Sequence, residues 1–145
     1  MTEVEFHTGV ADPVQFACIL LRRAARQGVR VQITAPSETL AALDRALWTF
    51  EERDFVPHVR MPGASPAVAR RTLLWLCTQA LTTDAPPVLV NLGGPAPLDP
   101  SQLERLIEIV GTDADEAAGG RQRWRDYKNA GLSPRHIDGT NTARG

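Results

Sequence analysis

The chain has 145 residues, with 43% hydrophobic and 23% charged side chains and a net charge of -1. These values are ordinary for one soluble globular domain that is large enough to bury a core. The net charge excludes a protein that is attracted to nucleic acid by its overall charge. Nucleic-acid binding would therefore need a local basic patch. No apolar run approaches the roughly 20 residues that span a bilayer, and no signal-peptide pattern begins the chain. We therefore expect a cytoplasmic protein without membrane contact.

The two cysteines, Cys18 and Cys77, each lie within an apolar run. This setting predicts small buried side chains in a reducing compartment rather than a disulfide. The sequence has neither a Cys-x-x-Cys pair nor histidines at the spacing of metal ligands. No metal site is predicted.

The chain begins with a predicted strand and helix. Residues 3–8 alternate apolar and polar side chains, which indicates a strand. Asp12 followed by Pro13 predicts a helix start, because aspartate is a favoured N-cap and proline is tolerated in the first turn. Gly28 predicts the end of this helix, after a last turn rich in arginine.

A second strand and a second helix follow. Residues 29–34 have the composition of a strand, and Ser37 is predicted to cap a helix over residues 37–48. An opening in the order strand, helix, strand, helix is typical of a sheet whose strands are mainly parallel.

The middle of the chain is less regular. Pro57 excludes a helix through residues 49–58, and residues 61–66 have the composition of a loop. The apolar run at residues 71–77 has two interpretations. Its bulky side chains favour a strand, whereas residues 67–80 also fit a single helix. We favour the strand.

Two more strands are predicted in the second half. Residues 88–92 form a short apolar run, and residues 106–110 form another that ends at Gly111. Between these runs, Asp99 followed by Pro100 predicts the start of a short helix.

The last predicted helix begins with Asp113 and Asp115, since acidic side chains suit the positive end of the helix dipole. It ends at Gly131. Residues 132–137 are expected to return as an edge strand, and residues 139–145 are expected to form a flexible tail.

Together these elements predict one α/β domain over residues 1–138, with three layers, a mainly parallel open sheet and helices on both faces. The topology is Rossmann-like, but the nucleotide-binding motifs are missing. Neither G-x-G-x-x-G nor G-x-x-x-x-G-K-[ST] is present. Gly93 and Gly94 follow a strand but lead into prolines rather than into a helix, so no phosphate cradle and no cofactor is predicted.

The sequence shows no catalytic constellation either. His7, His58 and His136 are far apart in the sequence, and no G-x-S-x-G motif is present. Proximity in space of a histidine to a nucleophile is left open. We expect the isolated chain not to be an enzyme.

Cations and aromatic side chains alternate only within residues 121–128. On a helix, one face carries positions i, i+3, i+4 and i+7, which are Arg121, Trp124, Arg125 and Lys128. Guanidinium groups beside a flat apolar ring suit a partner that carries carboxylates or phosphates together with an apolar anchor. The alternative is a solvated helix face with Trp124 half-buried against the domain.

Two segments resemble a known family. Residues 43–48 read Leu-Asp-Arg-Ala-Leu-Trp, and residues 55–58 read Phe-Val-Pro-His. Residues 121–131 read Arg-Gln-Arg-Trp-Arg-Asp-Tyr-Lys-Asn-Ala-Gly. Both segments, in this order and spacing, resemble the chi subunit of bacterial DNA polymerase III, and the similarity extends from the first strand to Gly131.

The resemblance implies a non-catalytic accessory subunit of the clamp-loader assembly. Its α/β fold would hold no nucleotide, and its contacts with the clamp loader and with DNA would be indirect. It would bind the acidic C-terminal tail of single-stranded-DNA-binding protein, which ends in an aromatic residue. The implied tail site consists of Val110, Arg121, Trp124 and Arg125, with Tyr127 and Lys128 nearby.

A second implied partner is the psi subunit, which joins chi to the clamp loader. The implied psi-facing surface consists of Trp48, Phe55, Val56, Pro57 and His58. Exposed aromatic side chains are common anchors of protein interfaces. The other interpretation is that Trp48 and Phe55 close the core beneath a loop.

The sequence also departs from the family pattern. Ala117 stands where better-known members carry a cation, which would lower tail affinity. Gly119 and Gly120 each cost a helix about 1 kcal/mol relative to alanine. Leu132 replaces an aromatic residue. A direct single-stranded nucleic-acid binder that uses the same helix is the alternative function, although the net charge argues against it.

Overall fold

The computed structural model describes residues 2–49, 56–82 and 84–138. Within these residues, seven parallel strands form one open sheet in the order β3-β4-β2-β5-β6-β1-β7. The strands are β1 (Glu3–Val10), β2 (Val31–Thr34), β3 (His58–Met61), β4 (Leu74–Cys77), β5 (Val88–Asn91), β6 (Arg105–Gly111) and β7 (Arg135–Asp138). The prediction of a mainly parallel sheet is confirmed.

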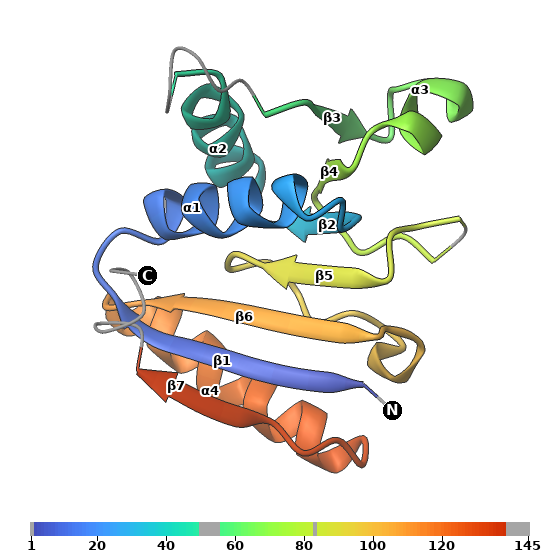
Figure 1. The fold of residues 1–145 in the computed structure, drawn as a ribbon. Coiled ribbons are helices and arrows are strands. Elements are labelled where there is room, and N and C mark those ends of the chain that lie inside the picture. The colour runs from blue at the N-terminus through green and yellow to red at the C-terminus, as the bar shows by residue number, and fades with distance from the viewer. Residues whose placement is uncertain (1, 50–55, 83, 139–145) are drawn as a thin grey trace.

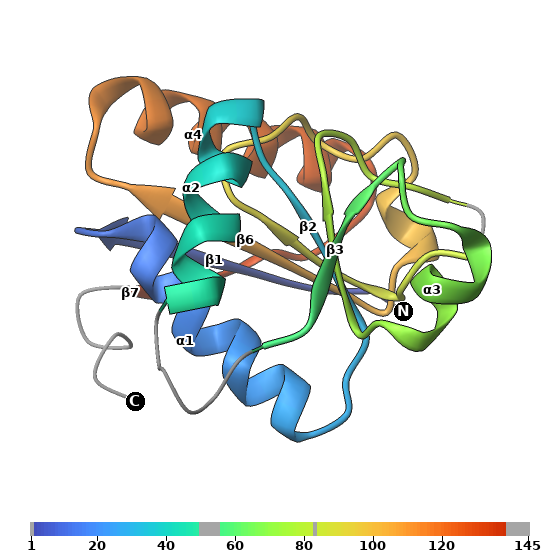
Figure 2. The same ribbon diagram turned by 90° about the horizontal axis from the view of Figure 1, so that it is seen from above.

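Helices cover both faces of this sheet. They are α1 (Pro13–Arg26), α2 (Ser37–Thr49), α3 (Pro66–Arg71) and α4 (Ala114–Asn129), with a 3-10 turn η1 (Pro100–Gln102). Figure 1 shows α1 and α2 on one side of the sheet and α4 on the other, and Figure 2 shows α1 and α2 from above. The predicted three-layer α/β architecture is therefore confirmed.

The ends of α1 form as the sequence predicts. The Asp12 side chain accepts a hydrogen bond from the Gln15 amide at 3.1 Å, and Pro13 occupies the first turn. Gly28, just after the helix, has a positive φ of 71°. Helix α2 differs slightly, because the Leu40 amide donates to the Pro36 carbonyl and Ser37 is already helical. Ser37 is therefore the first helical residue, and its prediction as the cap is wrong.

The apolar run at residues 71–77 proves to be divided. Helix α3 ends at Arg71, and β4 begins at Leu74. The strand interpretation is right for Leu74–Cys77, and the single helix over residues 67–80 is wrong. The break is stabilised by Trp75, whose ring N–H donates to the Ala69 carbonyl at 2.8 Å and to the Thr72 carbonyl at 3.1 Å.

Strand β3 was not predicted from the sequence. It follows Pro57 directly, it is only four residues long, and none of its residues is fully buried. Among the described residues it lies at the edge of the sheet and pairs with β4 alone. A short half-exposed strand leaves no apolar run for periodicity to detect.

Two apolar layers flank the sheet. The larger layer packs α1 and α2 against side chains such as Ile33, Val90 and Ile109. The opposite layer packs α4 against Phe6, Leu106 and Val110. Both cysteines are buried, as predicted, and burial raises the pKa of each thiol to about 11.

Candidate functional site

The candidate site is a cavity of about 700 Å³ where α4 crosses the carboxyl ends of β6, β1 and β7. Four of its residues were predicted from the sequence: Val110, Arg121, Trp124 and Arg125. The other lining residues are Phe6, Thr8, Gly9, Gly111, Thr112, Ala117, Gly120 and His136. We call this cavity the α4 pocket.

Aromatic packing forms the floor of the α4 pocket. Phe6, on β1, is only 2% exposed. Its ring meets Trp124 edge to face, with centroids 5.1 Å apart and planes at 66°. This is a favoured geometry for two aromatic rings. Trp124 is half-buried and lines the pocket, so part of its ring lies against the domain and part remains available to a ligand.

Gly120 explains how α4 comes so close to β6. A Cβ atom at this position would lie 2.9 Å from Cγ2 of Val110 and 3.0 Å from its Cγ1. Real side chains do not pack this closely, and valine is stiff about χ1. The glycine that appeared from the sequence as a helix-weakening feature therefore allows the contact that shapes the pocket.

The rim of the α4 pocket is positively charged. Arg121 and Arg125 are both exposed, and none of the described residues that line the pocket is acidic. One N–H of Arg125 donates to the side chain of Gln122 at 2.7 Å, which orients its guanidinium. His136, on β7, shares a 2.5 Å hydrogen bond with the hydroxyl of Thr8. The pocket can therefore receive an anion beside an apolar group.

The structure places Tyr127 away from this pocket. Tyr127 is 1% exposed, and its hydroxyl donates to Oε2 of Glu108 at 2.5 Å. Its side chain points beneath α4, so it cannot contact a ligand in the pocket directly. Lys128 is exposed one turn beyond Trp124 and does not line the pocket.

Glu108 is the centre of a buried polar network that the sequence did not reveal. Oε1 accepts from Arg123 at 2.8 Å, and Oε2 accepts from Asn91 at 3.0 Å as well as from Tyr127. Burial raises the pKa of Glu108, and these three donors oppose that rise. Burial and the neighbouring Glu108 also raise the pKa of Tyr127. The network fixes α4 to β5 and β6.

The glycines after β5 do not form an open phosphate cradle. The Gly94 amide donates to Oδ1 of Asn91 at 2.7 Å. Oδ1 also accepts from the hydroxyl of Thr34 at 3.1 Å. A Cβ on Gly94 would lie 3.0 Å from the same oxygen. The Gly94 amide is therefore already bound by the side chain of Asn91 and is not open to a phosphate.

The second predicted surface lies on α2 and the segment before β3. Trp48 is 60% exposed, so it does not close the core. Its ring meets His58 edge to face at 6.1 Å, and Nε2 of His58 lies 2.5 Å from Oδ1 of Asp44. Pro57 is exposed, whereas Val56 is 4% exposed and belongs to the core. Phe55 lies outside the described residues.

Apart from Val110 on β6, sequence reasoning missed the pocket residues that come from the strands. Phe6, Thr8 and His136 lie on β1 and β7, far from α4 in the chain. They meet α4 because β1 lies between β6 and β7 in the sheet. The alternation in the first strand indicated a strand there, but not which helix covers Phe6.

Two absences hold for the part of the chain that the structure describes. No three His, Cys, Asp or Glu side chains gather there in a group that could hold a metal ion. No helix there is long and apolar enough to cross a membrane.

The fold and the α4 pocket together define a class: a three-layer α/β protein with a cation-rimmed apolar pocket at the carboxyl edge of its sheet. The sequence model of a family described as DNA polymerase III chi subunit, HolC, matches residues 1–135. DNA polymerase III subunit chi of Pseudomonas aeruginosa is 30% identical over 141 residues, which cover 90% of this chain and 92% of that protein.

This chain therefore belongs to the DNA polymerase III chi subunit family, and the resemblance in its sequence is confirmed. Members of this family are accessory subunits of a replicative polymerase complex.

Proposed function

We propose that this protein is a non-catalytic, cytoplasmic subunit that links the clamp-loader assembly to single-stranded-DNA-binding protein. It does so by binding the acidic C-terminal tail of that protein in the α4 pocket. One observation carries the proposal: an apolar floor of Phe6, Val110 and Trp124 lies beneath a rim of two exposed arginines.

The chemistry of the tail fits this arrangement. A terminal aromatic ring needs an apolar cavity, and its α-carboxylate needs a guanidinium within hydrogen-bond distance. The second arginine would attract the acidic residues upstream of the terminal ring. The described lining carries no carboxylate that would repel them. Tyr127 supports the pocket through Glu108 rather than by contact, and Lys128 lies within reach of upstream acidic residues only.

Fluorescence anisotropy of a labelled acidic peptide ending in Ile-Pro-Phe tests the proposal. We expect micromolar binding to the natural protein and at least about a tenfold loss in Arg121→Ala and in Trp124→Ala, because each removes a charged or aromatic anchor. Arg60→Ala is the matched control. Arg60 is an exposed arginine on β3, at the opposite edge of the sheet.

Direct binding of single-stranded DNA by the same helix is the competing function. It predicts affinity for an oligonucleotide and a steep loss of that affinity with salt, because several phosphate contacts release several counterions. A short acidic tail predicts a shallower salt dependence and a strong requirement for the terminal ring. Oligonucleotide binding without peptide binding would overturn our proposal.

We further propose that the surface around Trp48 binds the psi subunit. The exposed fraction of Trp48 and its ring contact with His58 support this proposal, because a rigid exposed tryptophan is a typical interface anchor. Val56 would act by holding the segment in place, since it is buried. Co-expression with a psi subunit tests it: Trp48→Ala should abolish co-purification, and retained co-purification would contradict it.

A further inference from the structure

One titratable side chain of the α4 pocket takes no part in the function proposed for it. His136 lies on β7, where it is exposed and lines the pocket. In the sequence it is one of three histidines that are far apart in the chain. The fold brings it to the same cavity as Arg121 and Arg125, so its imidazole is within the reach of a ligand that these arginines bind.

The register of the sheet directs His136 toward the pocket. Strand β7 pairs in parallel with β1, and His136 lies beside Phe6, whose ring forms the pocket floor. Side chains alternate between the two faces of a sheet, so Phe6, Thr8 and His136 share the α4 face. Arg135 lies on the other face, where it donates to Glu5 at 3.0 Å. Of these two basic positions on β7, only His136 therefore faces the pocket.

The hydroxyl of Thr8 holds the imidazole in place. Oγ1 of Thr8 lies 2.5 Å from Nε2 of His136. A hydroxyl can donate or accept, so this bond persists whether Nε2 has a lone pair or carries a proton. His136 has no second partner among the described residues. When the ring is protonated, Nδ1 is therefore an N–H donor that is still available to a ligand.

The charged groups near His136 on the α4 side are mostly cationic. Arg121 and Arg125 face the pocket from α4, and no carboxylate belongs to the described lining. Asp138, two residues further along β7, does not line the pocket and has an interaction of its own. No described acidic side chain that lines the pocket therefore competes with a ligand for the protonated ring.

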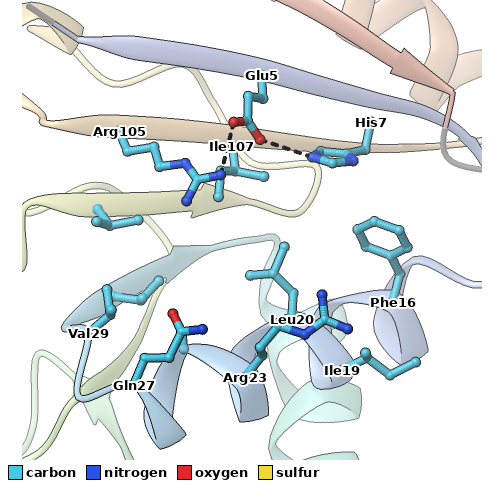
Figure 3. Close-up of a pocket in the computed structure, with 13 residues that line it drawn as sticks. Glu5, His7, Phe16, Ile19, Leu20, Arg23, Gln27, Val29, Arg105 and Ile107 are labelled. Carbon is cyan, nitrogen blue, oxygen red and sulfur yellow. Dashed lines mark hydrogen bonds and ion pairs between the residues drawn. The ribbon is translucent and has the colours of Figure 1, made fainter. Parts of the chain in front are cut away.

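The two titratable side chains of β1 point away from His136. Figure 3 shows Glu5 and His7 on the α1 side of the sheet. There Oε2 of Glu5 lies 3.3 Å from Nε2 of His7, and Oε1 accepts from Arg105 at 2.9 Å. Glu5 and His7 alternate with Phe6 along the strand, which explains why they project to the opposite face. Neither of them faces the α4 pocket.

This setting couples the proton of His136 to a bound anion. Histidine is the side chain that ordinarily changes charge between pH 8 and 5. Without an anion in the pocket, the two guanidinium groups disfavour a third positive charge, whereas a bound carboxylate favours it. Linkage is reciprocal, so protonation of the ring must strengthen carboxylate binding by the same factor.

We propose that His136 is a third anion-binding residue of the α4 pocket and that tail binding becomes stronger as pH falls from 8 to 6. The protonated imidazole donates through Nδ1 to a carboxylate of the tail from the strand side, while Arg121 and Arg125 contact the tail from α4. Thr8 is a positioning residue, because it orients the ring in both protonation states. This role depends on the tail binding proposed above and adds a specificity-determining residue to that site.

Fluorescence anisotropy of the same N-terminally labelled peptide at pH 6, 7 and 8, at constant ionic strength, tests the proposal. The label blocks the peptide's amino group and its carboxylates stay ionised over this range, so the charge of the peptide is constant. We expect the dissociation constant at pH 6 to be about three- to fivefold lower than at pH 8, as for an exposed charge pair.

Two variants at this exposed position separate charge from structure. His136→Gln can still bond to Thr8 but cannot gain a proton, so it should bind at every pH about as the natural protein does at pH 8. His136→Arg carries a permanent positive charge, so it should bind at pH 8 about as tightly as the natural protein does at pH 6. Both variants should lose the pH dependence.

NMR of the natural protein gives a readout that needs no variant. The C2–H resonance of His136 follows its protonation, and saturating peptide should move the midpoint of this titration to higher pH. An unmoved midpoint, or a pH dependence of binding that is the same in His136→Gln, would overturn this role of His136 and leave the proposed tail binding intact. No peptide binding at any pH would overturn both.

Discussion

Gly120 shows how a single hydrogen atom in place of a side chain shapes a binding site. The absence of a Cβ lets α4 lie against the two methyl groups of Val110. Alanine is the better helix former by about 1 kcal/mol, but overpacking a tight contact costs about 1–3 kcal/mol. Packing should therefore outweigh helix propensity at this position.

We predict that Gly120→Ala lowers the free energy of unfolding by about 1 kcal/mol and weakens tail binding, because α4 must move away from β6. Urea unfolding and peptide anisotropy measure the two effects. Gly119→Ala is the control. Its Cβ would meet only Nη1 of Arg123, at 3.1 Å, and this contact is looser than the two with Val110, so the substitution should cost less stability than Gly120→Ala and should keep tail binding. A destabilised Gly119→Ala together with an unaffected Gly120→Ala would contradict this account.

His7 and Glu5 make the stability of the fold depend on pH. The folded pKa of His7 is lower than its ordinary value of 6.5. Just below pH 6.5 the imidazole is therefore protonated in the unfolded chain but still neutral in the native protein. Stability from this residue is complete above pH 6.5 and decreases as pH falls below it. The folded pKa of Glu5 is lower than 4.5, so its contribution is complete above pH 4.5 and is lost below.

We predict that His7→Phe reduces the pH dependence of unfolding between about pH 6.5 and 5, because the titrating ring is gone. The midpoints of urea unfolding across this pH range measure that dependence. His58 and His136 are present in both proteins, so the difference between the two pH profiles isolates His7. Parallel profiles for the natural protein and the variant would show that His7 titrates alike in both states.

Helix α4 depends on its buried polar face as much as on its apolar one. Replacement of Tyr127 by phenylalanine removes the hydroxyl that donates to buried Glu108 and leaves that carboxylate with fewer donors. We predict that Tyr127→Phe lowers the free energy of unfolding by about 1–3 kcal/mol. Lys128→Ala, at the neighbouring exposed position, should change it by less than about 0.5 kcal/mol. Chemical denaturation of both variants provides the comparison, and equal stability of the two would contradict the role given to the network.

Element by element, the sequence predicted best where local chemistry is strong. Asp12, Pro13 and Asp113 mark helix starts through side-chain caps and first-turn preferences, and the structure has helices beginning there. The sequence was least informative near Arg71, where one apolar run contains the end of a helix and the start of a strand. There the boundary is set by contacts of Trp75 with the preceding turn, which periodicity does not record.

At the scale of the whole molecule, the candidate site depends on strand order. Arg121, Trp124 and Arg125 could be grouped from helical spacing alone. Phe6 and His136 could not, because they reach the α4 pocket only since β1 and β7 lie beside β6 in the sheet. Tyr127 was assigned to the same neighbourhood from its position in the motif, but its place on the helix directs it toward Glu108.

The two proposed partner surfaces lie on opposite faces of the sheet. Trp48 is on α2, and the α4 pocket is lined by residues of α4. Figure 1 shows these two helices on opposite faces of the sheet. Distant sites without shared contacts behave additively. We predict that Trp48→Ala leaves the affinity for the tail peptide unchanged and alters the free energy of unfolding by less than about 0.5 kcal/mol, because the ring is mostly exposed. Anisotropy and urea unfolding of this one variant test both statements. Weaker peptide binding would reveal coupling between the two faces.

The most direct test of the central claim is a double-mutant cycle between the α4 pocket and the end of the tail peptide. One axis is Arg121→Ala or Arg125→Ala in the protein, and the other is amidation of the peptide's terminal carboxylate. If that carboxylate lies in the pocket, at least one arginine should show a coupling energy above about 1 kcal/mol with it, and Arg60→Ala should show none. Equal losses on amidation in all three variants would place the tail elsewhere and contradict the account.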